Sequence, residues 1–276
     1  MNTFFLVDNG SLRASSTLNL RRIAANLSER TGLSVQPVSL LHSHKVDPDE
    51  LDGVPAKLLE HALRDELHKG AKTCGIVPLF FGPSRALTSY LPLRLKKIRE
   101  EFPGAKIGVA PSLFDPEKGT DFRLASILKD HLEEVLPPSG DSPVILLDHG
   151  SPAPEVSYVR DMIAGQLSVL LDGKVGRVRA ASMERRPGDA YRFSGPLLEE
   201  VLQQKNFNRG IVTLAMLFLS PGRHAGDKGD VWEICRRCEK ANPDLKVRMT
   251  RLVGEHPQLL AILEDRLQEA LDAAEN

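Results

Sequence analysis

Two short motifs in the second half of the chain contain histidines that could bind a metal ion or transfer a proton. One reads Asp-His-Gly-Ser at residues 148–151, and the other reads Ser-Pro-Gly-Arg-His at residues 220–224. The first half carries a copy of each, Asp-Asn-Gly-Ser at residues 8–11 and Gly-Pro-Ser-Arg-Ala at residues 82–86, and neither copy has the histidine. Neutral imidazole accepts protons near physiological pH and is a common metal ligand. Two histidines present in one copy only therefore indicate a single metal or proton-transfer site.

These motifs belong to a duplication that spans the whole chain. Each motif follows its counterpart by about 140 residues, and two further pairs keep the same order. The further pairs are residues 103–106 with 243–246, and residues 127–136 with 262–271. A chain of 276 residues is also long enough for about two domains. We therefore expect two homologous domains, residues 1–138 and 139–276, joined by a proline-rich linker at residues 137–143.

Composition and charge narrow the class of protein. The net charge of −1 argues against a nucleic-acid binder that relies on bulk electrostatics. No apolar run approaches the length of a membrane span. The amino terminus enters a strand-like run without a secretory signal, and 3 cysteines argue against a disulfide framework. We expect a cytoplasmic monomer or homodimer that needs no organic cofactor and binds neither nucleic acid nor membrane.

Short apolar runs alternate with amphipathic segments in both halves, which is typical of a parallel sheet covered by helices. The expected strands are residues 4–7, 35–41, 74–81, 106–110, 144–147, 178–182, 211–216 and 246–249. The clearest expected helices are residues 153–171, 196–204, 230–240 and 257–273. The predicted fold class is therefore α/β, with two homologous Rossmann-like lobes, each a four-stranded parallel sheet flanked by helices.

This arrangement places the histidines at one edge of the second sheet. His149 follows the first strand of its half, and His224 follows the third. Ligands of open parallel sheets bind beyond the carboxyl ends of the strands. The loop after the second strand offers Glu184, which would complete a His-His-carboxylate set suited to Zn, Co, Fe or Ni. The alternatives are two unrelated loop histidines and a solvated loop glutamate.

Residues kept in both copies have a structural interpretation as well. Asp148 and Asp8 are interpreted as structural or turn-forming residues in preference to ligands. Each side chain starts from the face of the strand opposite to that of the next residue, which is His149 in the second copy. Arg223 and Arg85 are also kept. Those two arginines could equally cap structure or bind substrate carboxylates.

Other residues with possible chemistry carry a weaker signal. Cys235 and Cys238 form a Cys-x-x-Cys pair, but it lies inside a predicted helix, so packing is the favoured interpretation over metal or redox chemistry. His42 and His44 lie in the first copy near the position of Glu184 and are interpreted as surface-loop residues.

Taken together, the motifs resemble the class II tetrapyrrole chelatases, specifically sirohydrochlorin chelatases of the CbiX/SirB type. That family has a strand ending in x-H-G-S, a middle loop with a glutamate or a basic-Arg-Pro element, and a third strand P-L-F-x-x-x-G-x-H. The matching segments here are residues 147–151, 183–187 and 217–227. The resemblance implies two Rossmann-like lobes with a cleft between them. It departs in one respect, because two-lobed members more usually carry the histidines in the first copy.

The resemblance also implies roles for residues. His149 and His224 would be metal ligands and proton acceptors, and Glu184 the third ligand. Sirohydrochlorin carries many carboxylates, so basic side chains should bind it. The expected substrate contacts are Ser151, Arg185, Arg186, Arg192, Arg223 and, from the first lobe, Arg85.

The predicted activity is insertion of a divalent metal ion, Co²⁺ or Fe²⁺ and less specifically Ni²⁺, into sirohydrochlorin or a related tetrapyrrole. The metal is a substrate of this lyase-type reaction, in cobalamin or sirohaem biosynthesis. One alternative is a non-catalytic tetrapyrrole- or metal-binding protein derived from a chelatase. A histidine phosphatase is less favoured, because that chemistry requires an arginine directly before the nucleophilic histidine, where this chain has Asp148.

Overall fold

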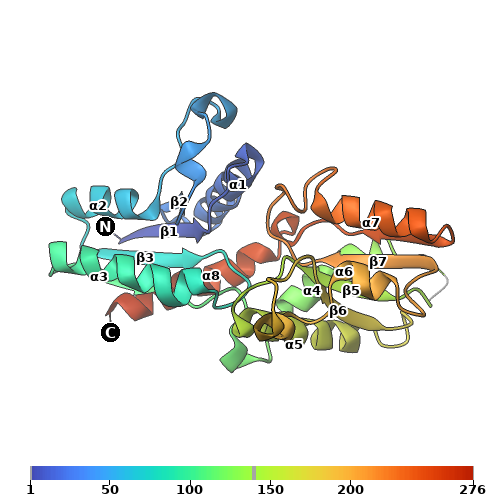
Figure 1. Ribbon diagram of the computed structural model, residues 1–276. Helices are drawn as coiled ribbons and strands as arrows, with labels where there is room; N and C mark the ends of the chain where they lie inside the picture. Colours follow the sequence, from blue (N-terminus) through green and yellow to red (C-terminus); the bar gives the residue numbers. More distant parts are fainter. Residues whose placement is uncertain (1, 139–140, 276) are drawn as a thin grey trace. The chain divides into compact units, whose positions relative to one another are not determined.

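Each half of the chain forms a four-stranded, all-parallel sheet in the computed structural model, which describes residues 2–138 and 141–275 (Figure 1). Sheet A has the order β2-β1-β3-β4, and sheet B has the order β6-β5-β7-β8. The strands of sheet A are β1 (Asn2–Asp8), β2 (Val35–Ser39), β3 (Thr73–Pro78) and β4 (Lys106–Val109). Those of sheet B are β5 (Val144–Asp148), β6 (Val178–Ser182), β7 (Gly210–Met216) and β8 (Leu245–Met249). The predicted α/β class, with two similar parallel sheets, is confirmed.

Helices cover both faces of each sheet, because the central strands β1, β3, β5 and β7 are buried on both sides. Around sheet A lie α1 (Ala14–Thr31), α2 (Leu59–His68) and α3 (Leu91–Glu101). Around sheet B lie α5 (Pro154–Leu170), α6 (Leu198–Leu202) and α7 (Asp230–Ala241). Helices α6 and α7 share one core cluster with one face of sheet B. Helices α7 and α5 lie on opposite sides of that sheet (Figure 1).

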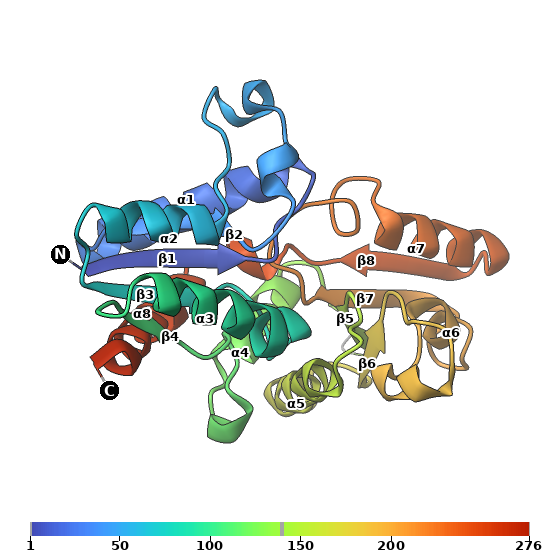
Figure 2. The ribbon, with the colours of Figure 1, turned by 60° about the vertical axis from the view of Figure 1, so that its left-hand side comes forward.

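The last helix of each repeat packs on the sheet of the other repeat. Helix α4 (Arg123–Glu133) contacts α5 and β7 of sheet B. Helix α8 (Leu259–Glu275) lies beside sheet A in both ribbon views (Figures 1 and 2). Gly108 of β4 permits that approach, since a Cβ atom there would lie 2.0 Å from the carbonyl oxygen of Ala270. Arg266 of α8 donates from Nε to the carbonyl oxygen of Ser112 at 2.8 Å.

The two compact units therefore do not coincide with the two sequence repeats. Unit 1 contains the chain up to Asp115 together with the chain from Leu260 onward, and unit 2 runs from Pro116 to Leu259. The expected domain boundary at residue 138 lies inside unit 2, between α4 and β5. Of the expected linker, Ser139 and Gly140 lie outside the described residues.

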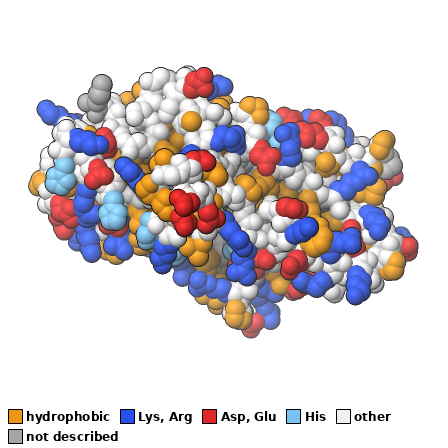
Figure 3. All heavy atoms as spheres, turned by 90° about the horizontal axis from the view of Figure 1, so that it is seen from above, with side chains coloured by type: hydrophobic (Ala, Val, Ile, Leu, Met, Phe, Trp, Pro, Cys, Tyr) orange, Lys and Arg blue, Asp and Glu red, His pale blue; other side chains and the backbone are white. Residues whose placement is uncertain are grey.

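The surface and the helices are consistent with the composition. Basic and acidic side chains are interspersed over the face seen in Figure 3. Within residues 2–138 and 141–275, every helix is too short or too polar to cross a membrane.

Candidate functional site

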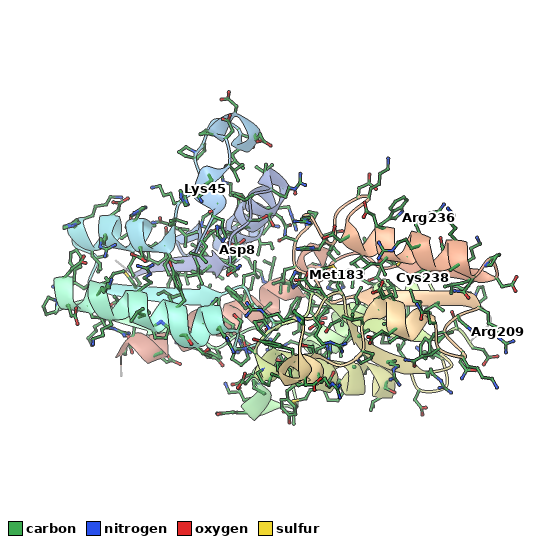
Figure 4. The ribbon with its side chains drawn as sticks, viewed as in Figure 1. Asp8, Lys45, Met183, Arg209, Arg236 and Cys238 are labelled. Carbon is green, nitrogen blue, oxygen red and sulfur yellow. The ribbon has the colours of Figure 1, made fainter. Side chains whose placement is uncertain are left out.

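The order of sheet B brings three loops to one place. Strand β5 lies between β6 and β7, and neighbouring strands are about 4.8 Å apart. His149 directly follows β5, Glu184 follows β6 after one buried residue, Met183 (labelled in Figure 4), and His224 lies in the loop between β7 and α7. The chain order of these strands reverses direction at β5, which is where open parallel sheets bind ligands.

The three side chains meet there. The ring centroids of His149 and His224 are 4.5 Å apart, with an interplanar angle of 70°. The Nε2 atom of His149 lies 3.5 Å from Oε1 of Glu184. The side chains of His149, Glu184 and His224 are 42%, 61% and 32% exposed. The group is thus open to solvent and accessible to a ligand.

Hydrogen bonds to the histidines define which ring nitrogen is free. Nδ1 of His149 bonds to the carbonyl oxygen of Gly150 at 3.0 Å, and Nδ1 of His224 bonds to Oδ2 of Asp230 at 2.6 Å. Carbonyl and carboxylate oxygens only accept, so Nδ1 is the donor in both rings, and in the neutral form of each ring Nε2 carries the lone pair. The Nε2 lone pair of His149 then faces a carboxylate oxygen of Glu184. A cation or a proton between these two atoms would stabilise that arrangement.

These residues offer a partial metal-binding set. In the part of the chain that the structure describes, no group of three or more His, Cys, Asp or Glu side chains is arranged as a ready metal cage. The two imidazoles are adjacent, and Glu184 approaches the ring of His149 from an exposed loop. Two imidazoles and a carboxylate suit a borderline divalent metal. The three-ligand set stays a prediction.

A tight turn after β5 holds His149 close to the Glu184 loop. Gly150 has φ +93°, and a Cβ atom there would lie 2.0 Å from the carbonyl oxygen of Glu184. Glycine is therefore required by both conformation and space. The backbone N–H of Glu184 donates to the carbonyl oxygen of His149 at 3.1 Å. Ser151, a predicted substrate contact, accepts from the N–H of Ala153 through Oγ at 3.1 Å, which is a turn-forming contact.

A buried polar network lies beneath the turn. Arg160 of α5 is 1% exposed and donates from Nη1 to the carbonyl oxygen of Ser194 at 2.6 Å. The same Nη1 lies 3.5 Å from Oδ1 of Asp148, which also accepts from Oγ of Ser182 at 2.8 Å. Burial raises the pKa of the Asp148 carboxyl, and the charge of Arg160 opposes that rise. The structural interpretation of Asp148 agrees with these contacts.

The predicted substrate arginines of unit 2 have partners of their own. Arg185 donates to the carbonyl oxygen of Gly195 at 2.7 Å and pairs with Glu200 at 3.3 Å. The guanidinium of Arg186 lies 5.8 Å from the ring centroid of Tyr191. These contacts hold two of the arginines to their own loop.

The other three arginines extend into solvent. Arg192 pairs with Asp189 at 2.8 Å while 76% exposed. Arg223 lies 3.5 Å from Oδ2 of Asp230 while 73% exposed, and Arg85 is exposed in unit 1. The role of all five arginines in substrate binding stays a prediction.

The first repeat, which lacks both histidines, keeps the backbone contacts of this site but has different residues at the ends of its strands. The N–H of Leu41 donates to the carbonyl oxygen of Asn9 at 3.1 Å, and Gly10 has φ +88°. These contacts match those of Glu184, His149 and Gly150. Asn9, Leu41 and Ala86 therefore stand where unit 2 has His149, Glu184 and His224. His42 and His44 follow Leu41 and are offset from the position of Glu184.

The cysteine pair contributes to packing, as predicted. Cys235 and Cys238 lie on α7 in the core cluster of sheet B. Burial raises the pKa of the Cys235 thiol to about 12, so it stays protonated at neutral pH.

Sequence reasoning missed one residue of the site, Asp230. Its contact with His224 depends on the conformation of a glycine-rich loop between them, in which Lys228 has φ +52°. An aspartate at the start of a predicted helix was visible in the sequence, but that signal alone indicates helix stabilisation.

Comparisons with known proteins agree with this description. Several solved structures are similar to the chain, and three of them are chelatases or chelatase relatives by name. "SirB from Bacillus subtilis with Fe3+" has a TM-score of 0.75 and 16% identity, over 99% of this chain and 97% of that one. The sirohydrochlorin chelatase SirB from Bacillus subtilis subspecies spizizenii in complex with cobalt has a TM-score of 0.72 and 15% identity, over 99% and 97%. "CbiX, the terminal Enzyme for Biosynthesis of Siroheme in Denitrifying Bacteria" has a TM-score of 0.60 and 16% identity, over 98% and 100%.

Similarity to solved structures at this level of identity establishes the fold. A search of curated proteins gives no match. The CbiX family model matches residues 143–270, which contain β5 to β8 and the three residues of the site. The second half of the chain thus matches the CbiX family, as its histidine motifs predicted.

Proposed function

We propose that the protein inserts a divalent metal ion, Co²⁺ or Fe²⁺, into sirohydrochlorin or a related tetrapyrrole, as a lyase of cobalamin or sirohaem biosynthesis. The observation that carries the proposal is the meeting of His149, His224 and Glu184 beyond three adjacent strands, in the half that the CbiX model matches. The relatives described as holding Fe³⁺ or cobalt support it.

The geometry suits a metal that is bound and then released. A resident metal cofactor is usually held by a buried set of ligands, whereas these three side chains are one-third to two-thirds exposed. Glu184 lies on a loop and is the most exposed of the three. It can rotate toward the imidazoles when an ion arrives and away from them when the ion leaves.

Metal insertion also requires removal of two protons from the pyrrole nitrogens. The Nε2 atoms of His149 and His224 both keep a lone pair, so each imidazole can accept one of those protons. Both rings are exposed enough to pass a proton to water afterwards. The same two atoms would thus hold the metal before insertion and take protons during it.

The peripheral carboxylates of the tetrapyrrole require cations. Arg186, Arg192 and Arg223 are exposed on unit 2, and Arg85 is exposed on unit 1. Guanidinium groups bind carboxylates through paired hydrogen bonds. We propose these four for that task. Arg185 is a weaker candidate, because its guanidinium already bonds to Gly195 and Glu200.

The test is insertion of Co²⁺ into sirohydrochlorin, followed by absorbance. We expect His149→Gln and His224→Gln each to lower the rate by about 100-fold or more, because each removes a metal ligand and a base. His61→Gln, which changes an exposed histidine on α2, is the matched control and should keep the wild-type rate. Wild-type protein that binds Co²⁺ and the tetrapyrrole without turnover would favour the non-catalytic alternative.

A further inference from the structure

The bond between His224 and Asp230 is short and involves a charged acceptor. Oδ2 of Asp230 lies 2.6 Å from Nδ1 of His224, below the usual N–H···O distance of about 2.9 Å. Charged acceptors form shorter and stronger hydrogen bonds than neutral ones. Asp230 is the first residue of α7, so its backbone is fixed by a regular element. The orientation of the His224 ring is thereby tied to the start of a helix.

The loop between the two residues is built to bring them together. The N–H of Val231 donates to the carbonyl oxygen of His224 at 3.1 Å, and the N–H of Asp230 donates to that of Arg223 at 3.2 Å. A Cβ atom at Gly229 would lie 2.7 Å from the carbonyl oxygens of both Arg223 and His224. Only glycine fits there, so the chain folds back on itself at this point.

The degenerate repeat provides an internal comparison. The buried faces of α3 and α7 correspond residue by residue, which places Tyr90 at the position of Asp230. The corresponding pairs are Leu91 with Val231, Leu95 with Cys235 and Ile98 with Cys238. The repeat without histidine at Ala86 therefore also lacks the aspartate. Its connection is shorter and forms a helical turn, Ala86–Tyr90, directly before α3. Asp230 and His224 are thus both absent from the first repeat, whereas the strand aspartate and the turn glycine are present in both repeats.

We propose that Asp230 is a positioning residue for His224. It holds the hydrogen on Nδ1 and so keeps the lone pair on Nε2, in a ring that lies beside His149, available to an ion. The link to metal chemistry rests on the proposed function, while the effect on the ring follows from the contact itself. A carboxylate that holds the second nitrogen of a metal-binding histidine typically contributes about 10- to 100-fold in metal affinity.

A purely structural role for Asp230 must be separated from this one. An acidic residue in the first turn stabilises a helix through the helix dipole, and Glu233 lies in the same turn. Loss of that effect would lower the thermal stability and leave the tautomer of His224 unchanged. The decisive measurement is therefore the tautomer, which helix stability alone does not set.

The experiment uses the full chain with nitrogen-15-labelled histidine. Two-dimensional NMR assigns the tautomer of His224, identified by loss of its signals in His224→Gln. The variants are Asp230→Asn and, as the matched control, Asp227→Asn, which removes the same charge from the same loop. We expect the wild type and Asp227→Asn to carry the hydrogen on Nδ1. In Asp230→Asn the Nε2–H form should gain population, and the affinity for Co²⁺ alone, measured by calorimetry, should fall by about 10- to 100-fold.

Each result decides between the two proposals. An unchanged tautomer in Asp230→Asn, with Co²⁺ affinity within twofold of the wild type, overturns the positioning role and leaves the proposed function intact. A changed tautomer and weakened Co²⁺ binding support it even where the wild type fails to insert metal, in which case only the chelatase function is lost.

Discussion

At the residue scale, the two repeats differ in the residues that surround the last aspartate of their first strand, as well as in the residues of the site. Asp8 and Asp148 occupy the same register position, each opposite a serine, Ser39 or Ser182, on the neighbouring strand. Both α1 and α5 begin three residues after the serine of their turn, which places Leu20 where unit 2 has Arg160. Unit 1 therefore lacks the cation that accompanies the buried aspartate in unit 2.

The pKa of Asp8 reflects that difference. Burial raises the pKa of its carboxyl to about 6, although hydrogen bonds with Ser39 and the backbone oppose the rise. Its Oδ1 atom has no hydrogen-bond partner within the described parts of the chain. The folded state then keeps a proton on Asp8 at pH values where the unfolded chain, with a pKa of 3.8, has lost it. Folding stability should therefore fall as the pH rises from about 4 to above 6.

We expect Asp8→Asn to remove this pH dependence. A shift from 3.8 to about 6 corresponds to about 3 kcal/mol. The variant should match the wild type near pH 4 and exceed it by up to about 3 kcal/mol at pH 8, because the amide resembles the protonated acid. Urea unfolding at both pH values measures the difference. Asp49→Asn, at an exposed aspartate of unit 1, is the control. Equal pH dependence in Asp8→Asn and the wild type would show that Asp8 is ionised at no cost.

Residue types and spacing were enough to predict that His149, His224 and Glu184 lie near one another, because the topology of a parallel sheet brings loop ends together. Their roles as ligands stay a prediction. Residue types and spacing were insufficient for Asp230 and Arg160. Asp230 reaches His224 only through a loop with a positive φ at Lys228, and Arg160 is a cation on the buried face of a helix. A contact that depends on the conformation of a loop leaves little signal in a single sequence. The same holds for a charged side chain that is buried, because its residue type predicts exposure.

At the element scale, three adjacent strands of sheet B deliver the site, and each has a counterpart in sheet A. The counterpart loops differ in more than the histidines. Leu41 replaces the carboxylate, and the connection after Ala86 is a helical turn in place of the glycine-rich loop. The first repeat therefore lacks the ligand side chains, and it also lacks the backbone conformation that would orient them.

This difference predicts the outcome of restoring the histidines. We expect the double variant Asn9→His with Ala86→His to bind Co²⁺ with the same stoichiometry as the wild type, one ion per chain under the proposed function. The reason is that Leu41 offers no carboxylate ligand in place of Glu184. Tyr90 likewise offers no carboxylate partner for Nδ1 in place of Asp230. Calorimetric titration measures the stoichiometry. A second tight site in the double variant would mean that two histidines suffice, and the roles given to Glu184 and Asp230 would be wrong.

The strands and the four named helices of the second half were predicted within a few residues, since periodicity reports them directly. The partners of α4 and α8 were not predicted. An apolar stripe such as Leu263 and Leu267 shows that a helix is buried on one side, but it does not say against which sheet. Gly108, whose missing Cβ admits α8, is readable as a site of close approach only after the helix is placed.

At the scale of the whole molecule, the exchanged helices mean that a repeat is not a folding unit. Unit 2 contains α4 from the first repeat, where His131 and Leu132 are fully buried, and it ends before the main part of α8. A fragment cut at the repeat boundary would lack α4 and carry α8 without its sheet. A fragment cut at the unit boundary would keep α4 together with α5 and β7, which it contacts.

We therefore expect residues 116–259 to fold as a fragment and residues 139–276 to fold poorly. The first should unfold cooperatively in urea, because it contains the core cluster of sheet B, α6 and α7 and also keeps α4. The second exposes the apolar side of α8 and the surface of α5 and β7 that α4 covers, so it should aggregate or unfold without a sharp transition. Circular dichroism during urea titration compares the two. If residues 139–276 unfolded as cooperatively as residues 116–259, the packing of α4 on unit 2 would contribute little, and each repeat would be an independent domain after all.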